Sequence, residues 1–257
     1  MQKKYLLYID ILGFGSLSSR NDEKVKEIYQ IIDDLNVHSH DAFDIFVFSD
    51  TILVTNKHDL TDQHSHEYHI MYSCEFVQDL LYRCEARRLD VPFRAILCYK
   101  EFEYYRLKNI TCYHGMALID CYKREKELNG VGLFIHKDIL EYHRFFDTLE
   151  YDDSLHYVFL AKALSRYYDL FKGETPLPKD YIDPSYEFLG LPTEIEIIKK
   201  YYNQSISNKD PRIRAKYLQT YQFYKSKYPI IMGKLETNGF SCEVISPGAD
   251  WEAQRWK

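Results

Sequence analysis

The chain has 257 residues, enough for one large domain or for a domain with a substantial appendage. Hydrophobic residues make up 46% of it and charged residues 28%, which excludes an intrinsically disordered chain. The formal net charge of −6 argues against a general nucleic-acid-binding protein, because such proteins depend on many Lys and Arg contacts to phosphates. We therefore expect no stable nucleic-acid partner.

Cysteine usage and hydropathy predict a cytoplasmic protein that does not enter a membrane. The six cysteines include no C-x-x-C pair and no zinc-type spacing, so the thiols are expected to be reduced. The apolar run near the N-terminus is interrupted by Asp10 and is not followed by the small-residue cleavage site of a signal peptide. No stretch approaches the ~18 apolar residues that a membrane span requires.

The first elements are a strand and a helix. Residues 5–11 form a continuous apolar run that is too short for a helix and predicts a buried strand, ended by Gly13 and Gly15. Apolar residues at helical spacing follow between Val25 and Leu35, and Asn21 or Asp22 is expected to cap that helix.

The next elements predict a split βαβ arrangement. Two β-type runs, 45–48 and 52–55, flank Ser49 and Asp50, which predicts a hairpin with a tight tip. After it we expect a long helix around 70–84, strands over 93–99 and 110–113, a helix over 116–128 and a strand over 131–135. This order predicts an antiparallel hairpin at the centre of the sheet and helices on one face.

The region after about residue 171 differs in composition. Four of the eight prolines fall within 17 positions there: Pro176, Pro178, Pro184 and Pro192. Thr193 and Glu196 have the spacing of a capping box, and Asp210-Pro211 is a typical helix start, so we expect helices over 194–204 and 211–227. We divide the chain into a domain of residues 1–170 and a helical extension, 171–257, packed on it.

Asp10 is the first candidate functional residue. A carboxylate at the end of a buried strand can reach a cation, and the Ile11 carbonyl can add a ligand. The N–H groups of the following turn, at Gly13 and Phe14, can approach phosphate oxygens. The alternative is that Asp10 only caps the turn.

Asp50 is the second candidate. Aspartate in a turn is commonly structural. In a split βαβ sheet, however, the first strand lies beside the hairpin, so Asp10 and Asp50 are expected to meet at one edge. Two neighbouring carboxylates repel each other unless a divalent cation joins them.

These two segments resemble the metal-binding motifs of class III adenylate and guanylate cyclases. The first motif reads YIDILGFGSL and the hairpin motif reads FVFSDTILV. Weaker similarities follow at residues 93–97, 115–118 and 132–135, so that the resemblance covers roughly 4–140. The pattern most resembles the bacterial cyclases of Pycsar antiphage defence, which make cyclic pyrimidine mononucleotides.

The resemblance implies an α+β, ferredoxin-like, palm-type fold and a reaction. Asp10, Ile11 and Asp50 would hold two Mn²⁺ or Mg²⁺ ions, and a nucleoside triphosphate would be converted to a 3′,5′-cyclic mononucleotide and pyrophosphate. The family implies a homodimer with the sites at the interface. The cyclic nucleotide would act as a second messenger that a separate effector protein reads.

The sequence departs from the family pattern at Phe46, Ile119 and Lys123, whereas Cys112 at the second base-reading position is as in guanylate cyclases. Where the family reads the base, this chain has Phe46 and Cys112, and Phe46 favours a pyrimidine nucleotide, UTP or CTP. On the late helix, Ile119 and Lys123 replace an Asn and an Arg that stabilise the transition state. Lys123 can still contribute a positive charge, and the candidate substitutes for the lost groups are Arg94, Lys100 and Arg124.

Other interpretations come from different classes. A palm-type polymerase and a nucleotide sensor that has lost its catalytic activity are the two alternatives. His58, His64, His66 and His69 with Glu67 resemble a metal cluster, but they favour a solvated loop over a zinc site.

Overall fold

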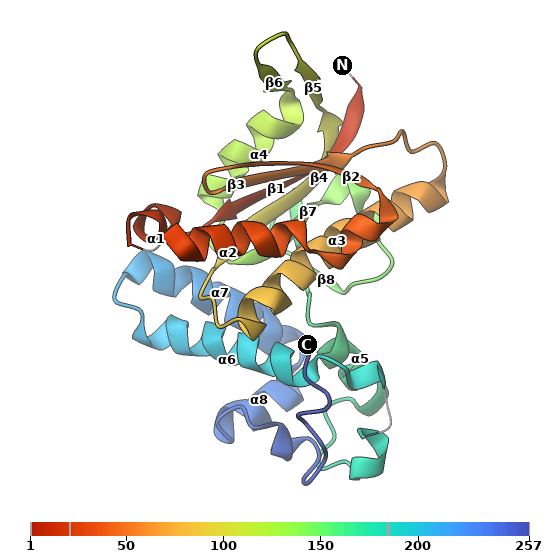
Figure 1. Ribbon diagram of the computed structural model, residues 1–257. Helices are drawn as coiled ribbons and strands as arrows, with labels where there is room; N and C mark the ends of the chain where they lie inside the picture. Colours follow the sequence, from red (N-terminus) through yellow and green to blue (C-terminus); the bar gives the residue numbers. More distant parts are fainter. Residues whose placement is uncertain (1, 21, 184–185, 257) are drawn as a thin grey trace. The chain divides into compact units, whose positions relative to one another are not determined.

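The computed structural model describes residues 2–183 without position 21, and residues 186–256 (Figure 1). The chain forms two compact units. The N-terminal unit contains the chain as far as Cys84 together with Leu89–Leu160, and the C-terminal unit contains Glu85–Arg88 and the chain from Ala161 onward. None of the helices in the described part combines the length and apolar character that a bilayer crossing requires.

A seven-stranded sheet forms the centre of the N-terminal unit, with strand order β2-β3-β1-β4-β7-β9-β8. Its strands are β1 (Lys3–Ile11), β2 (Phe43–Phe48), β3 (Thr51–Asn56), β4 (Phe93–Glu101), β7 (Gly132–His136), β8 (Thr148–Glu150) and β9 (Leu155–Val158). Only β4 and β7 pair in parallel; every other neighbouring pair is antiparallel. The expected α+β class is confirmed.

The expected place of the hairpin in the sheet is wrong. The β2–β3 hairpin lies at one edge, and β1 and β4 lie further in; β9 and β8 extend the sheet beyond β7 at the other edge. A separate two-stranded sheet, β5 (Glu103–Arg106) and β6 (Thr111–His114), forms an arm between β4 and the following helix. The strand expected over 110–113 is confirmed as β6.

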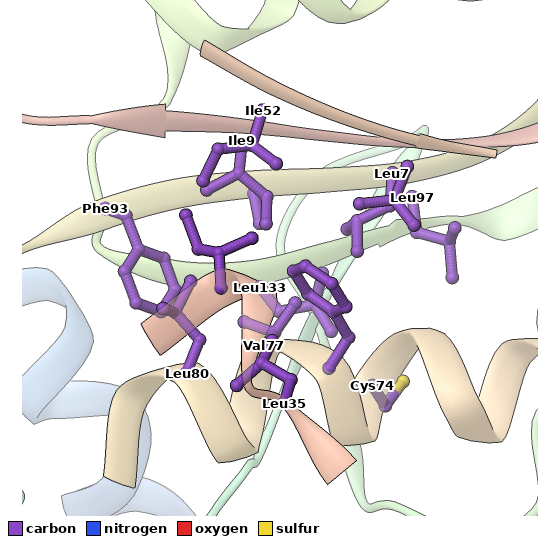
Figure 2. Packing of buried hydrophobic residues seen from close by; sticks show 14 of the residues in the cluster. Leu7, Ile9, Leu35, Ile52, Cys74, Val77, Leu80, Phe93, Leu97 and Leu133 are labelled. Atoms are coloured by element: carbon purple, nitrogen blue, oxygen red, sulfur yellow. The ribbon is translucent and has the colours of Figure 1, made fainter. Parts of the chain in front are cut away.

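Three α-helices precede β4 in the described part of the chain: α1 (Phe14–Arg20), α2 (Asp22–Asp33) and α3 (Gln63–Ala86). Alternate residues of β1, such as Leu7 and Ile9, pack with Leu35 from the segment after α2 and with Val77 from α3 (Figure 2). This packing forms the main hydrophobic core, and the period of two along β1 decides which side chains enter it. The cap expected at Asn21 or Asp22 lies outside the described side chains.

Helix α4 (Met116–Glu127) covers the opposite face, so the expectation of helices on one face only is wrong. The β4 side chains that do not enter the main core contact α4: the Sγ atoms of Cys98 and Cys121 lie 3.6 Å apart. The helix begins after Gly115, whose φ of 139° is left-handed. A Cβ there would lie 2.2 Å from the Glu101 carbonyl oxygen, so only glycine fits.

The C-terminal unit is helical. Its α-helices are α5 (Lys162–Phe171), α6 (Leu191–Ser207), α7 (Pro211–Lys227) and α8 (Pro229–Thr237). Both expected helices are confirmed, as α6 and α7, whereas α5 and α8 were not expected. The 3₁₀ helices of the two units are Asn36–His40, Lys137–Tyr142, Lys179–Tyr181, Tyr186–Phe188 and Cys242–Val244.

The two helix starts that the sequence predicted have different outcomes. Asp210 caps α7, and its Oδ1 accepts a hydrogen bond from the Arg212 N–H at 2.8 Å. The capping box is wrong, because α6 already begins at Leu191. Thr193 Oγ1 instead accepts from the N–H of Trp256, and Glu196 forms a two-bonded ion pair with Arg255.

Candidate active site

The two candidate aspartates meet at the end of β1. Asp10 pairs in register with Thr51 of β3 on one side and with Arg94 of β4 on the other. The N–H of Ile11 donates a hydrogen bond to the Asp50 carbonyl at 2.9 Å. The structure therefore brings the first strand and the hairpin tip together, as the split βαβ arrangement predicted.

A hydrogen bond from helix α2 holds the tip of the β2–β3 hairpin. Ser49 has a left-handed φ of 57°, which allows a tight two-residue turn between β2 and β3. The Tyr29 hydroxyl donates to the Ser49 carbonyl at 2.9 Å. Burial raises the pKa of the Tyr29 phenol, and the nearby charge of Asp50 raises it further. Sequence reasoning gave Tyr29 only a place on an apolar helix face.

The glycine turn leaves space beside the aspartates. Gly13 has a left-handed φ of 76°, and a Cβ placed on it would meet no atom within 4 Å. The Leu12 N–H donates to the Pro92 carbonyl at 2.8 Å, which holds the start of the turn against the chain entering β4. Phe14 is buried and begins α1, with its ring centroid 6.5 Å from that of Tyr29.

Tyr8 is a neighbour of the two candidate aspartates that sequence reasoning missed. It precedes Asp10 by two positions, so both project from the same face of β1. Burial is the largest cause of the raised pKa of the Tyr8 phenol. A hydrogen bond with Thr51 acts against it, and the charges of Asp10 and Asp50 add to it. The period of two along the strand would have indicated this neighbour.

Asp10 also contacts a buried ion pair. An Arg94 guanidinium nitrogen, Nη2, lies 3.1 Å from Asp10 Oδ2 and is in contact with Glu125 Oε1. The other, Nη1, donates to the Glu125 carbonyl at 2.7 Å. Burial lowers the pKa of Arg94, and the charge of Asp10 opposes that effect.

The donor set at this edge fits a hard divalent cation. Two carboxylates, with a backbone carbonyl between them in the chain, supply the oxygen ligands that Mg²⁺ and Mn²⁺ prefer. The open space beside Gly13 leaves room for phosphate oxygens and water to complete the coordination. Among the described residues, no group of three or more His, Cys, Asp and Glu side chains is arranged to hold a metal. Any metal here therefore depends on the two aspartates together with a backbone carbonyl, phosphate oxygens and water.

Comparisons with known proteins identify the architecture. No family model and no curated protein matches the sequence. A monomeric guanylyl cyclase domain of the RhoGC fusion protein from the fungus Blastocladiella emersonii matches in structure, with a TM-score of 0.50 and 15% identity. The match covers 62% of this chain and 94% of that domain. The fold is that of a nucleotidyl cyclase domain.

Two further cyclase structures are similar to a smaller degree. The guanylate cyclase domain of RhGC from Catenaria anguillulae, solved with GTP, has a TM-score of 0.47 at 13% identity, covering 62% of this chain and 96% of that one. The adenylyl cyclase CyaB from P. aeruginosa has a TM-score of 0.44 at 10% identity, covering 62% and 95%.

The candidate cations of this cyclase fold differ in their surroundings. Lys100 forms an ion pair with Asp120 at 2.6 Å, and Arg124 pairs with Glu127 at the same distance. Lys123 is exposed on α4, and no ion pair of its side chain is found within the described residues. Ile119, one turn earlier, is 45% exposed.

Of the two expected base-reading residues, Phe46 of β2 contacts one face of the β5–β6 arm, and Cys112 of β6 lies on the other face. The Phe46 ring packs 4.8 Å from the rings of Tyr104 and Tyr113, which are cross-strand partners. Cys112 pairs with Tyr105 and therefore projects from the other face. Within one chain, the structure does not bring Phe46 and Cys112 together.

The expected solvated loop is confirmed only at His58, which is exposed and precedes α3; it is wrong for the other three histidines. His64, His66 and His69 belong to α3. His69 is buried between aromatic rings, and this burial lowers its pKa to about 3. His66 Nδ1 lies 2.9 Å from the Tyr5 hydroxyl. His66 and His69 both contact Tyr5 and so contribute to the packing of α3 on β1, whereas His64 contacts Tyr68 of its own helix.

Proposed function

We propose that this chain is a nucleotidyl cyclase that converts a nucleoside triphosphate to a 3′,5′-cyclic mononucleotide and pyrophosphate. The observation that carries the proposal is the meeting of Asp10 and Asp50 at the end of β1 in a cyclase fold. In the reaction, the ribose 3′-oxygen bonds to the α-phosphorus, the bond from that phosphorus to the β-phosphate oxygen breaks, and the hydroxyl proton leaves to solvent.

Asp10, Asp50 and the Ile11 carbonyl would hold two Mg²⁺ or Mn²⁺ ions. When bound, such ions lower the pKa of the 3′-hydroxyl and neutralise charge on the leaving pyrophosphate. Tyr29 fixes the turn that carries Asp50, and the pairing of β1 with its two neighbours fixes Asp10. The amides of Gly13 and Phe14 face the open side of the turn in this proposal and bind phosphate oxygens.

Completion of the site by a second copy is part of the proposal. Three apolar side chains are exposed at a spacing of three residues along α4: Met116 at 47%, Ile119 at 45% and Tyr122 at 53%. An exposed apolar stripe of this kind supports a protein interface. In a two-fold homodimer, Lys123 of one protomer would supply positive charge to the aspartates of the other.

A pyrimidine triphosphate, UTP or CTP, is the proposed substrate. The aromatic group of Phe46, Tyr104 and Tyr113 offers ring faces on which a small base could stack, although Asp44 and Lys4 also contact Tyr104. We further propose that the product acts in the cytoplasm as an antiphage signal read by a separate effector protein.

The deciding experiment incubates the purified chain with each labelled nucleoside triphosphate and Mn²⁺ or Mg²⁺, and identifies products by mass. We expect a cyclic mononucleotide, lost in Asp10→Asn and Asp50→Asn and kept in Asp153→Asn, which changes an exposed carboxylate of the β8–β9 turn. Linear products joining two or more nucleotides would instead identify a polymerase. Nucleotide binding without turnover would identify a sensor.

A further inference from the structure

A buried ion pair lies directly behind the candidate metal site. Arg94 on β4 is 7% exposed and Glu125 on α4 is 6% exposed. The guanidinium nitrogen that contacts Glu125 also reaches Asp10, whose side chain is 18% exposed. A single cation is therefore shared between a candidate metal ligand and a second carboxylate that is almost completely buried.

Helix α4 holds Glu125 in this place. Cys98 and Cys121 contact each other one turn away, and Lys100 pairs with Asp120 at 2.6 Å. The Glu125 backbone carbonyl also accepts a hydrogen bond from Arg94 at 2.7 Å. These contacts hold α4 against β4. The backbone of Glu125 therefore keeps its place beside the Arg94 guanidinium.

The charges at this edge have opposite effects on a cation bound there. Asp10, Asp50 and Glu125 carry negative charge and Arg94 carries positive charge. A metal ion bound by Asp10 would compete with the Arg94 guanidinium, which already contacts that carboxylate. Glu125 adds negative charge near the site. It also binds the same guanidinium, which weakens the ion pair between Arg94 and Asp10.

We propose that Arg94 and Glu125 are positioning residues that set the affinity of the Asp10–Asp50 site for divalent cations. The inference rests on the proposed function, since it requires Asp10 to be a metal ligand. It assigns Glu125, which no sequence motif marks, the task of balancing the charge of Arg94. Neither residue touches the substrate in this proposal.

The proposal predicts effects of opposite sign. Glu125→Gln keeps the shape of the side chain and an acceptor oxygen but removes the negative charge. The ion pair between Arg94 and Asp10 then becomes stronger, so Mn²⁺ binds on the order of tenfold more weakly. Arg94→Met removes the competitor and one positive charge, so Mn²⁺ binds more tightly. The double variant Arg94→Met/Glu125→Leu removes both charges and returns the affinity towards the wild-type value, and it also avoids a lone buried charge.

The experiment measures Mn²⁺ binding to the full chain without nucleotide, by titration calorimetry and by the electron paramagnetic resonance signal of free Mn²⁺. Thermal unfolding without metal shows how much each variant is destabilised. Glu127→Gln is the matched control, because it removes an exposed carboxylate from the same helix without contact to Arg94. We expect Glu127→Gln to bind Mn²⁺ as the wild type does.

Different results overturn the inference and the proposed function. If Asp10→Asn abolishes Mn²⁺ binding but Glu125→Gln matches Glu127→Gln, the inference fails and the metal site stands. Shifts of the same sign in Glu125→Gln and Arg94→Met also refute the inference, because loss of structure alone would weaken both. If the wild type binds no Mn²⁺, or if Asp10→Asn binds it equally well, the proposed function fails as well.

Discussion

The Tyr29 hydroxyl and the Ser49 carbonyl, 2.9 Å apart, tie helix α2 to the turn that carries Asp50. Without this bond, the tip of an edge hairpin would depend on its own turn and on its pairing with β1. A carboxylate that must share a cation with Asp10 requires a more constrained backbone than such a tip provides.

Loss of the Tyr29 hydroxyl is expected to affect activity more than stability. Tyr29→Phe removes one hydrogen bond, which should lower the free energy of unfolding by about 1 kcal/mol. The looser tip should lower the cyclase rate roughly tenfold. Chemical denaturation and product formation measure the two effects. Tyr186→Phe, with a residue 90% exposed, is the control; equal activity in both variants would count against the anchoring role.

Mixing two inactive variants tests the dimeric arrangement. If one protomer gives the aspartates and the other gives Lys123, then Asp10→Asn and Lys123→Ala are each inactive alone. Co-refolded in equal amounts, they form heterodimers with one intact site, and about a quarter of wild-type activity should return. Light scattering measures the mass of the active species. No recovery, or a fully active monomer, would contradict the shared site.

Substrate preference tests the aromatic group around Phe46. The wild type should turn over UTP or CTP faster than ATP or GTP, because a pyrimidine can stack on the ring without a charged partner, a contact worth ~1–3 kcal/mol. Phe46→Ala should reduce that preference, while Phe145→Ala, at an exposed aromatic residue, should leave it unchanged. Turnover of the four nucleotides measures the preference. A wild-type preference for purines would refute the pocket, and an unchanged pyrimidine preference in Phe46→Ala would refute the part of Phe46.

Acid should destabilise the fold through His69. Its pKa is lowered from 6.5 to about 3 by burial, so the unfolded chain takes up the proton at higher pH than the folded chain does. The free energy of unfolding should therefore fall as pH drops below about 6.5, by at most ~1.4 kcal/mol per pH unit from this group. In His69→Phe that part of the pH dependence should disappear. Denaturation at pH 7.5, 6 and 5 measures it; identical slopes in both proteins would contradict the assignment.

The sequence predicts most of the site but little of its surroundings. Asp10 and Asp50 stand out because each follows an apolar β-type run, and the order of elements places those runs side by side. Glu125 does not stand out, because a glutamate on an amphipathic helix is normally solvated, and only the position of Arg94 on the neighbouring strand explains its burial.

The extent of the sheet was missed for a related reason. Strands β8 and β9 are three and four residues long, and the first carries polar residues such as Thr148 and Glu150. Short runs of this kind have no clear period, so their pairing depends on contacts with β7 that lie far away in the sequence. The capping box at Thr193 failed because α6 begins at Leu191, so Thr193 lies inside the helix; its side chain and that of Glu196 bond to Trp256 and Arg255 instead.

The backbone at Gly115 has a consequence for how this chain can evolve. The Glu101 carbonyl closes the space that any side chain would need, and the φ of 139° is itself unfavourable for every other residue. Substitutions there should be removed by selection, whereas Glu127, exposed at the other end of the same helix, should vary freely. We therefore expect the start of α4 to stay the same among related proteins, while exposed positions outside any interface can vary.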